Sequence, residues 1–162
     1  MPFLNTLDRL LSRVIAAAQW LALPLILLLF LQWPLRDVVR AYSSQANDLG
    51  QIFFALFVAA SVTAATRAGT HLAADTVAQR YSARTRFWLK RIGSVVSVLP
   101  WALFIVVASK SFVVPSVLEL ESFSETSNPG YFLIKCALWL MAFMVIAQAV
   151  LDILRPFPAD DV

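Results

Sequence analysis

The sequence VIAAAQWLALPLILLLFLQW, residues 14–33, contains twenty consecutive residues without a charge. A helix of about 20 apolar residues is long enough to cross the hydrocarbon core of a bilayer, which is about 30 Å thick. Pro24 predicts a kink, which membrane helices tolerate because neighbouring groups can satisfy the freed carbonyl. Trp20 and Trp33 lie towards the two ends, where indole rings prefer the membrane interface. The stretch therefore predicts a first membrane span.

The composition of the whole chain points the same way. Of its 162 residues, 60% are hydrophobic and only 14% are charged, and the mean hydropathy is +0.75. A soluble domain has about 25% charged residues, so this excess of apolar side chains indicates a bilayer. The net charge of +3 is too small and scattered for a nucleic-acid-binding protein. The single cysteine, Cys136, lies inside an apolar run, which excludes a disulfide framework.

Three more apolar segments follow, so we predict an all-α polytopic membrane protein with four transmembrane helices. Their only charges, Lys110 and Lys135, lie near span ends, where a long side chain can reach the interface. Residues 1–155 would form one four-helix transmembrane domain, and residues 156–162, with two prolines and two aspartates, a short disordered tail. The predicted spans are residues 14–33, 49–66, 92–114 and 131–151.

The N-terminal segment, residues 1–13, is amphipathic. Its leucines alternate at helical spacing with Asp8, Arg9 and Arg13, so the segment could lie on the membrane surface. The following apolar run is too long for a signal peptide and lacks a small-residue cleavage site. We therefore expect this segment to remain in the protein.

The distribution of Lys and Arg predicts the orientation. Four spans place both termini on one side, together with the polar loop at residues 67–91. That side carries nine basic residues and the other side four, and the positive-inside rule therefore places both termini and the basic loop in the cytoplasm. The nine are Arg9, Arg13, Arg67, Arg80, Arg84, Arg86, Lys90, Arg91 and Arg155, and the four are Arg36, Arg40, Lys110 and Lys135.

The basic loop also contains the only histidine. Arg67, His71 and Asp75 are spaced i, i+4 and i+8, so they share one face if the second helix continues. One histidine supplies too few ligands for a metal site, and nothing around Ser61 resembles an activated nucleophile. A structural or docking role is favoured. Further along, the basic residues of the segment Arg80–Arg91 predict contact with anionic lipid. Ser82 is predicted to cap a short helix.

Several kinds of chemistry lack the residues they need. Ion-coupled carriers usually need a charge near the middle of a span, and a haem anchor needs axial ligands inside the membrane. The sequence offers neither, and it contains no phosphate-binding loop. We therefore predict no catalytic, cofactor or metal site, and a subunit of a larger assembly rather than an enzyme.

Short motifs then point to a family. RAGTHLAAD at residues 67–75 resembles the pattern Arg-x-Gly-x-His-x-x-x-Asp that follows the second span in the small membrane subunit of tripartite ATP-independent periplasmic (TRAP) transporters, the DctQ-like family. The order of the motifs against four spans is similar over about residues 5–155. The other landmarks are Ser82 to Arg86, Val39 to Tyr42, Asp48, Glu121 with Ser122, Lys135 and Gln148.

The resemblance implies a non-catalytic small permease in the bacterial inner membrane. It would belong to a Na⁺-coupled uptake system for organic acids, bracing a large membrane subunit that works with an extracytoplasmic substrate-binding protein. No cofactor is implied, and the remaining contacts would be with membrane lipid. The residues expected to fix helix ends or contact the partner are Arg67, Gly69, His71, Asp75, Arg40, Asp48 and Lys135.

Two other functions remain open from the residues alone. The chain could be an anchor or assembly subunit of a membrane redox complex, although its lone histidine lies in a loop. It could also be a stand-alone small exporter, although its uncharged spans argue against ion coupling.

Overall fold

The computed structural model describes residues 2–39, 43–68 and 81–156, which form helices joined by short connections and contain no strand. An isolated bridge pairs Ser122 with Pro129. The tail predicted at residues 156–162 lies outside the described residues except for Pro156. The helices are α1 (Pro2–Gln19), α2 (Ala22–Asp37), α3 (Ser44–Ala68), α5 (Ala83–Gly93), the π-helical turn η1 (Ser94–Val98), α6 (Leu99–Leu118) and α7 (Tyr131–Leu154).

Four helical stretches are long and apolar enough to cross a membrane: Pro2–Pro34, Ser44–Ala68, Arg84–Leu118 and Tyr131–Leu154. This confirms the predicted all-α class with four potential spans. The third stretch has 35 residues and is about 52 Å long at 1.5 Å per residue. It is therefore much longer than the hydrocarbon core, so part of it extends beyond that core.

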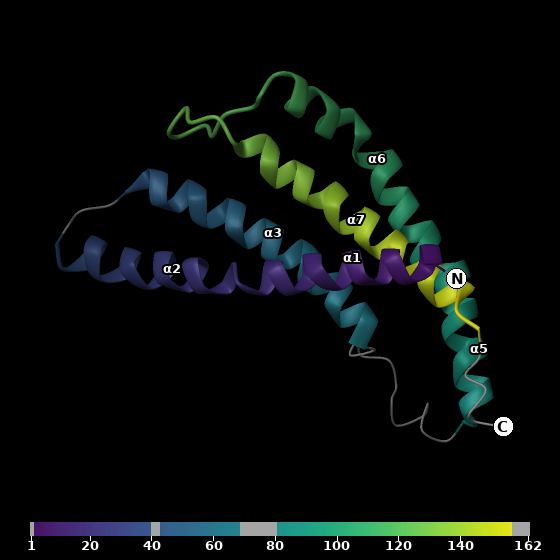
Figure 1. Cartoon of the computed structure of the whole chain (residues 1–162). Helices are drawn as coiled ribbons and strands as arrows, with labels where there is room; N and C mark the ends of the chain where they lie inside the picture. Colours follow the sequence, from purple (N-terminus) through teal and green to yellow (C-terminus); the bar gives the residue numbers. More distant parts are fainter. Residues whose placement is uncertain (1, 40–42, 69–80, 157–162) are drawn as a thin grey trace.

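The four long helices form an open row rather than a closed bundle (Figure 1). Helix α2 packs on α3, α3 packs on α7, and α7 packs on α6, so α2 and α6 form the two edges. Helix α1 crosses the row and contacts both α3 and α7. The row leaves much of each edge helix without a neighbour from the same chain.

Helix α7 is the most buried member of the row. Its small residues Ala137, Ala142 and Ala149 are almost completely buried, as are Ala59 and Ala60 of α3. Small side chains allow two helix backbones to approach closely, which is how helices associate where lipid offers no hydrophobic driving force. The alanines therefore explain why α3 and α7 form the central contact.

Helix α1 uses its apolar face to pack on protein. Leu4 and Leu11 are buried in one cluster with Ala60 of α3 and with Met144 and Leu151 of α7. The sequence allowed residues 1–13 to lie on the membrane surface, and the structure adds that two of the leucines of this segment pack on protein. The leucine face covers the ends of two neighbouring helices, which offer a closer apolar partner than the lipid interface.

A break separates α1 from α2 one turn before Pro24. Proline has no backbone N–H, so Pro24 cannot donate to the Trp20 carbonyl four residues earlier. The N–H of Leu23 contacts that carbonyl instead, at 3.3 Å. The helix is therefore interrupted just before Pro24, and residues 2–19 form one continuous helix up to this break.

A second proline explains the π-helical turn η1. Pro100 cannot donate to the Val96 carbonyl, and just before it the chain widens its turn over Ser94–Val98. The N–H of Leu99 donates to the Ser94 carbonyl five residues earlier, which is the π-helical pattern. The turn joins α5 to α6 in one continuous helical rod. We call this the third rod, because it contains the third of the four potential spans.

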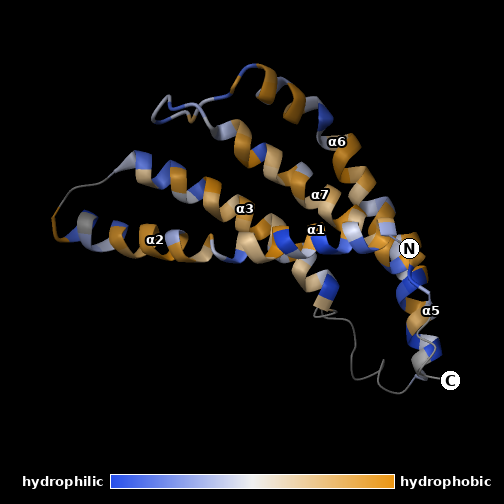
Figure 2. Cartoon of the chain, viewed as in Figure 1, coloured by the Kyte–Doolittle hydropathy of each residue, from blue (hydrophilic) through white to orange (hydrophobic). Residues whose placement is uncertain are grey.

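Hydrophobic residues predominate along the long helices of the row (Figure 2), and many of their large side chains are exposed. Along α2, large side chains are more than half exposed, and along α6 Phe104 and Val107 are too. Apolar surfaces of this extent are not left in water, so they face lipid or another protein. The exposed side chains of α2 include Leu23, Ile26, Leu27, Phe30 and Trp33.

Candidate functional site: polar clusters at the helix ends

The first polar cluster lies at the end of the row where α1 and α7 meet. The carboxylate of Asp8 accepts a hydrogen bond from Arg67 of α3 and another from Arg155 just after α7, each at 2.5 Å between Oδ1 and Nη2. The side chains of Asp8 and Arg67 are only 28% and 29% exposed. One carboxylate therefore ties α1 to the ends of two helices. We call Asp8, Arg67, Lys90, Gln148, Asp152 and Arg155 the terminal cluster.

Asp152 extends this cluster to α5. Its side chain is 6% exposed and lies 3.2 Å from the ammonium of Lys90, measured from Oδ1 to Nζ. The amide of Gln148, one turn earlier on α7, donates to the same oxygen at 3.1 Å. A buried carboxylate needs such partners because an unpaired buried charge is costly. The pair fixes the start of the third rod against α7.

Three buried polar atoms near this end form no hydrogen bond with any of the residues that the structure describes. They are the hydroxyl of Thr63, the Nη1 atom of Arg67 and the amide oxygen of Gln148. Thr63 and Arg67 are one turn apart on α3, and buried polar groups are nearly always hydrogen-bonded. The terminal cluster therefore has unused hydrogen-bonding capacity.

The second polar cluster lies at the opposite end of the row, around the connection from α6 to α7. Asp48, in the second turn of α3, is 7% exposed. Its Oδ2 accepts hydrogen bonds from the hydroxyl of Thr126 at 2.5 Å and from the amide of Asn128 at 3.4 Å. The carboxylate thus fastens the connection between α6 and α7 to the start of α3.

A second carboxylate, Glu121, holds the same connection to α6 and α7. It accepts hydrogen bonds from the hydroxyl of Ser116 and the ammonium of Lys135. The bond from Lys135, with a smaller contribution from Ser116, lowers the pKa of Glu121 below its ordinary value. The Lys135 ammonium also lies 5.3 Å from the centre of the Tyr131 ring. The loop cluster comprises Asp48, Ser116, Glu121, Thr126, Asn128 and Lys135.

The backbone of this connection is tightly folded. Helix α6 continues past Pro115 to Leu118, so the connection is shorter than the sequence suggested. Gly130 has φ of +143°, which side chains rarely allow, and a Cβ there would lie 3.4 Å from Ile52 of α3. The glycine lets α7 begin directly against α3.

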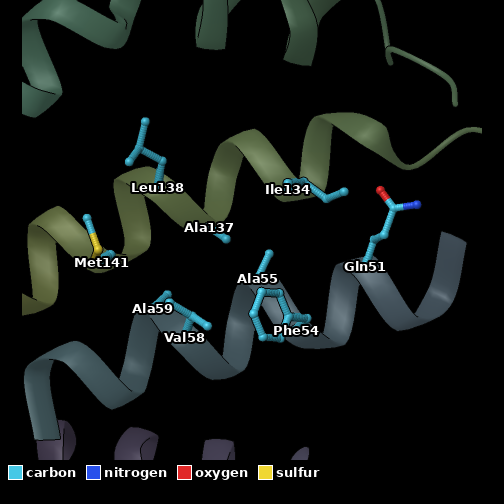
Figure 3. Close-up of a pocket in the computed structure, with 9 residues that line it drawn as sticks. All are labelled: Gln51, Phe54, Ala55, Val58, Ala59, Ile134, Ala137, Leu138 and Met141. Atoms are coloured by element: carbon cyan, nitrogen blue, oxygen red, sulfur yellow. The ribbon is translucent and has the colours of Figure 1, made fainter. Parts of the chain in front are cut away.

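The grooves between the helices are apolar. One of them has a volume of about 380 Å³ and lies between α3 and α7. Figure 3 shows Phe54, Val58 and Met141 among its lining residues, with Gln51 towards one end. Its lining contains no ionisable side chain, so it lacks groups for acid–base or nucleophilic chemistry. Among the described residues, no group of three or more His, Cys, Asp or Glu could hold a metal ion.

Comparison with known families decides the identity. The family model described as Tripartite ATP-independent periplasmic transporters, DctQ component, matches residues 25–159, which is most of the chain.

The chain belongs to the DctQ family.

It is therefore a multi-pass membrane protein and a non-catalytic component of a TRAP transporter, as the sequence motifs predicted. No curated protein and no solved structure matches the chain significantly.

The DctQ match covers all of the predicted site residues. Three of them fall in the polar clusters: Arg67 in the terminal cluster, and Asp48 and Lys135 in the loop cluster. Lys135 is paired with Glu121 of the connection between α6 and α7. The other four, Arg40, Gly69, His71 and Asp75, lie outside the described residues, as does the shared helical face expected for Arg67, His71 and Asp75.

Several cluster members were not singled out from the sequence. Asp8 lies before the DctQ match begins, and Arg155 lies near its end. The signal for Asp8 was present, because it is the only acidic residue of an otherwise basic amphipathic segment. Its partners are 59 and 147 residues away, and spacing alone cannot identify them.

Proposed function

We propose that this DctQ-family chain is a rigid brace for the large membrane subunit of its transporter. The observation that carries the proposal is the open row of four helices. Its polar groups pair near the helix ends, whereas its flanks present large apolar side chains. A closed bundle would bury these side chains within the chain. An open row offers them to another membrane protein over the full depth of the bilayer.

The two polar clusters support a bracing role. The loop cluster joins α3, α6 and α7 at one end, and the terminal cluster joins α1, α3, α5 and α7 at the other. Fastening both ends of the row limits sliding and splaying of the helices. A transport subunit that changes conformation needs a fixed scaffold relative to which it can move.

We also infer the orientation and the transport reaction. The basic end, which contains the terminal cluster, faces the cytoplasm of the bacterial inner membrane, because it carries nine of the thirteen Lys and Arg residues. The Na⁺ and organic-acid sites belong to the large subunit, since the described grooves of this chain lack ionisable groups at membrane depth. An extracytoplasmic binding protein delivers the substrate to the side of the loop cluster.

The test is co-purification of the tagged chain with the large subunit, together with uptake of the organic acid by cells. Arg67→Ala and Asp75→Ala should each reduce assembly or uptake, because both residues lie in the family motif. Arg36→Ala is the matched control, since its described pair with Asp37 is exposed and lies within one helix end. Normal co-purification and normal uptake in both motif variants would overturn the role given to this motif.

A further inference from the structure

A second apolar groove lies where α3 and the third rod diverge above α7. Its volume is about 360 Å³, and it is lined by Val62 and Thr66 of α3, by Ser97, Val98 and Trp101 of the third rod, and by Val145 of α7. Both α3 and η1 pack on α7, but they have no extensive contact with each other. The groove is therefore a gap between two helices with a third helix as its floor.

The residues that line the groove from the third rod belong to the same continuous helical stretch as the basic helix α5. Arg86 and Lys90 are one turn apart on α5, and the rod continues from them through the π-helical turn η1, which contains Ser97, to Trp101. Lys90 precedes Trp101 by eleven residues, or about 16 Å along the rod, which is about half the hydrocarbon core. The distance between the cations and the groove is therefore similar to the distance between the headgroup of a phospholipid and the upper part of its acyl chain.

Helix α5 offers more positive charge than the described acidic residues near it compensate. It contains Arg84, Arg86, Lys90 and Arg91 and no acidic residue. Of these, only Lys90 pairs with an acid among the described residues. Arg91 lies 5.5 Å from the centre of the Trp88 ring, and this indole is half exposed. Exposed indoles beside arginines are typical of the membrane interface, where phosphate groups lie.

We infer that this corner of the protein binds one anionic phospholipid. The arginines of α5 hold the headgroup, and one acyl chain occupies the groove between Val62, Val98 and Trp101. Charge complementarity selects the lipid, because a helix of another protein would need acidic residues placed along α5 as well as an apolar face to fill the groove. The inference concerns the chain alone and does not depend on how it braces the large subunit.

The test uses the full chain, purified, delipidated and returned to nanodiscs of phosphatidylcholine with or without phosphatidylglycerol. Bound lipid is counted by native mass spectrometry, and the apparent affinity comes from titrating phosphatidylglycerol at two salt concentrations. We expect one retained phosphatidylglycerol, with affinity falling at higher salt. Arg84→Gln with Arg86→Gln should weaken binding about fivefold for each arginine removed.

Two further variants make the result specific. Arg9→Gln with Arg13→Gln removes the same charge from the exposed side of α1 and should leave the affinity unchanged. Ser97→Phe fills the groove at an exposed position, so it should release the lipid without unfolding the chain. Equal binding of both lipids, equal effects of the two arginine pairs, or a lipid retained by Ser97→Phe would each overturn the inference.

A cysteine introduced at the groove distinguishes a bound lipid from the other possible occupants. Ser97→Cys should react with a membrane-permeant thiol reagent after delipidation and be protected when phosphatidylglycerol is added. A cysteine that stays unreactive after delipidation would show that residues 69–80 cover the groove. A cysteine that cross-links to the large subunit would show that the partner covers it. Either result overturns the lipid assignment.

Discussion

The loop cluster and the terminal cluster fasten opposite ends of the same row, but they differ in how completely their groups are paired. In the loop cluster, Asp48 and Glu121 each accept two hydrogen bonds from groups of the same chain. Near the terminal cluster, polar atoms of Thr63, Arg67 and Gln148 are buried without a hydrogen-bond partner in the described part of the chain. Buried polar groups without partners are costly. The difference indicates that the groups of the first end are paired within the described residues, whereas the second end has capacity for a further partner.

The largest effect is expected from Asp8→Ala, which breaks the terminal cluster. It leaves the partly buried Arg67 and the half-exposed Arg155 without their carboxylate, and α1 loses its polar link to α3 and α7. We expect a loss of about 1–3 kcal/mol, below the value for fully buried pairs because water screens these groups. Thermal unfolding in mild detergent measures it, with Asp37→Ala as the exposed control. Equal melting temperatures for the two variants would contradict this account.

The loop cluster should respond to Asp48→Ala by a similar or slightly smaller amount. Removing the buried carboxylate leaves the Thr126 hydroxyl and the Asn128 amide without their acceptor, at a cost of about 1–2 kcal/mol. Glu125→Ala, at an exposed position of the same connection, serves as control. Because the groups of this end are paired within the described residues, the loss should be equal in the isolated chain and in the assembled transporter. A loss seen only in the transporter would contradict the comparison.

A smaller effect concerns the pH dependence of the loop cluster. Hydrogen bonds from Lys135 and Ser116 lower the pKa of Glu121, so the folded state binds its proton less readily than the unfolded state. The stability that this group contributes is complete above the ordinary carboxyl pKa of about 4.3 and is lost as the pH falls through the lower folded value. Glu121→Gln should therefore be destabilising at pH 7 and less so towards pH 3. A constant difference in melting temperature across this range would count against the lowered pKa.

The smallest effect is expected for Lys90→Gln. The lysine is about half exposed, and Asp152 retains the amide of Gln148 as a partner. Pairs with a solvent-exposed member typically contribute about 0.2–1 kcal/mol. The matched change at the buried member, Asp152→Asn, should cost more, and unfolding of the two variants under the same conditions gives the order directly. The reverse order would show that the charge of Lys90 matters more than its exposure suggests.

The sequence predicted those features that depend on local chemistry. Twenty uncharged residues indicate a span, and Pro24 indicates a kink because it lacks an N–H. Ser82 was predicted to cap a helix beginning at Ala83, and its hydroxyl accepts from the N–H of Thr85 at 3.2 Å. These inferences need only neighbouring residues and a known helix period.

Features that depend on distant partners could not be predicted in the same way. The amphipathic pattern of residues 1–13 shows which face is apolar but not whether lipid or protein covers it. Asp8 could equally have paired with a nearby arginine, and the sequence does not show that Glu121 lies beside Lys135. The choice of partner depends on the order in which the helices of the row pack. The spacing of residues in the sequence does not reveal this order.

The ion pair between Asp8 and Arg155 also bears on biosynthesis. Its two residues are separated by 147 positions, so the pair can form only when nearly the whole chain has left the ribosome. Until α7 has entered the membrane, α1 lacks both its apolar floor at Met144 and Leu151 and one of its two arginines. Complete packing of α1 over the row is therefore a late step of maturation, because it requires α7 to be in place.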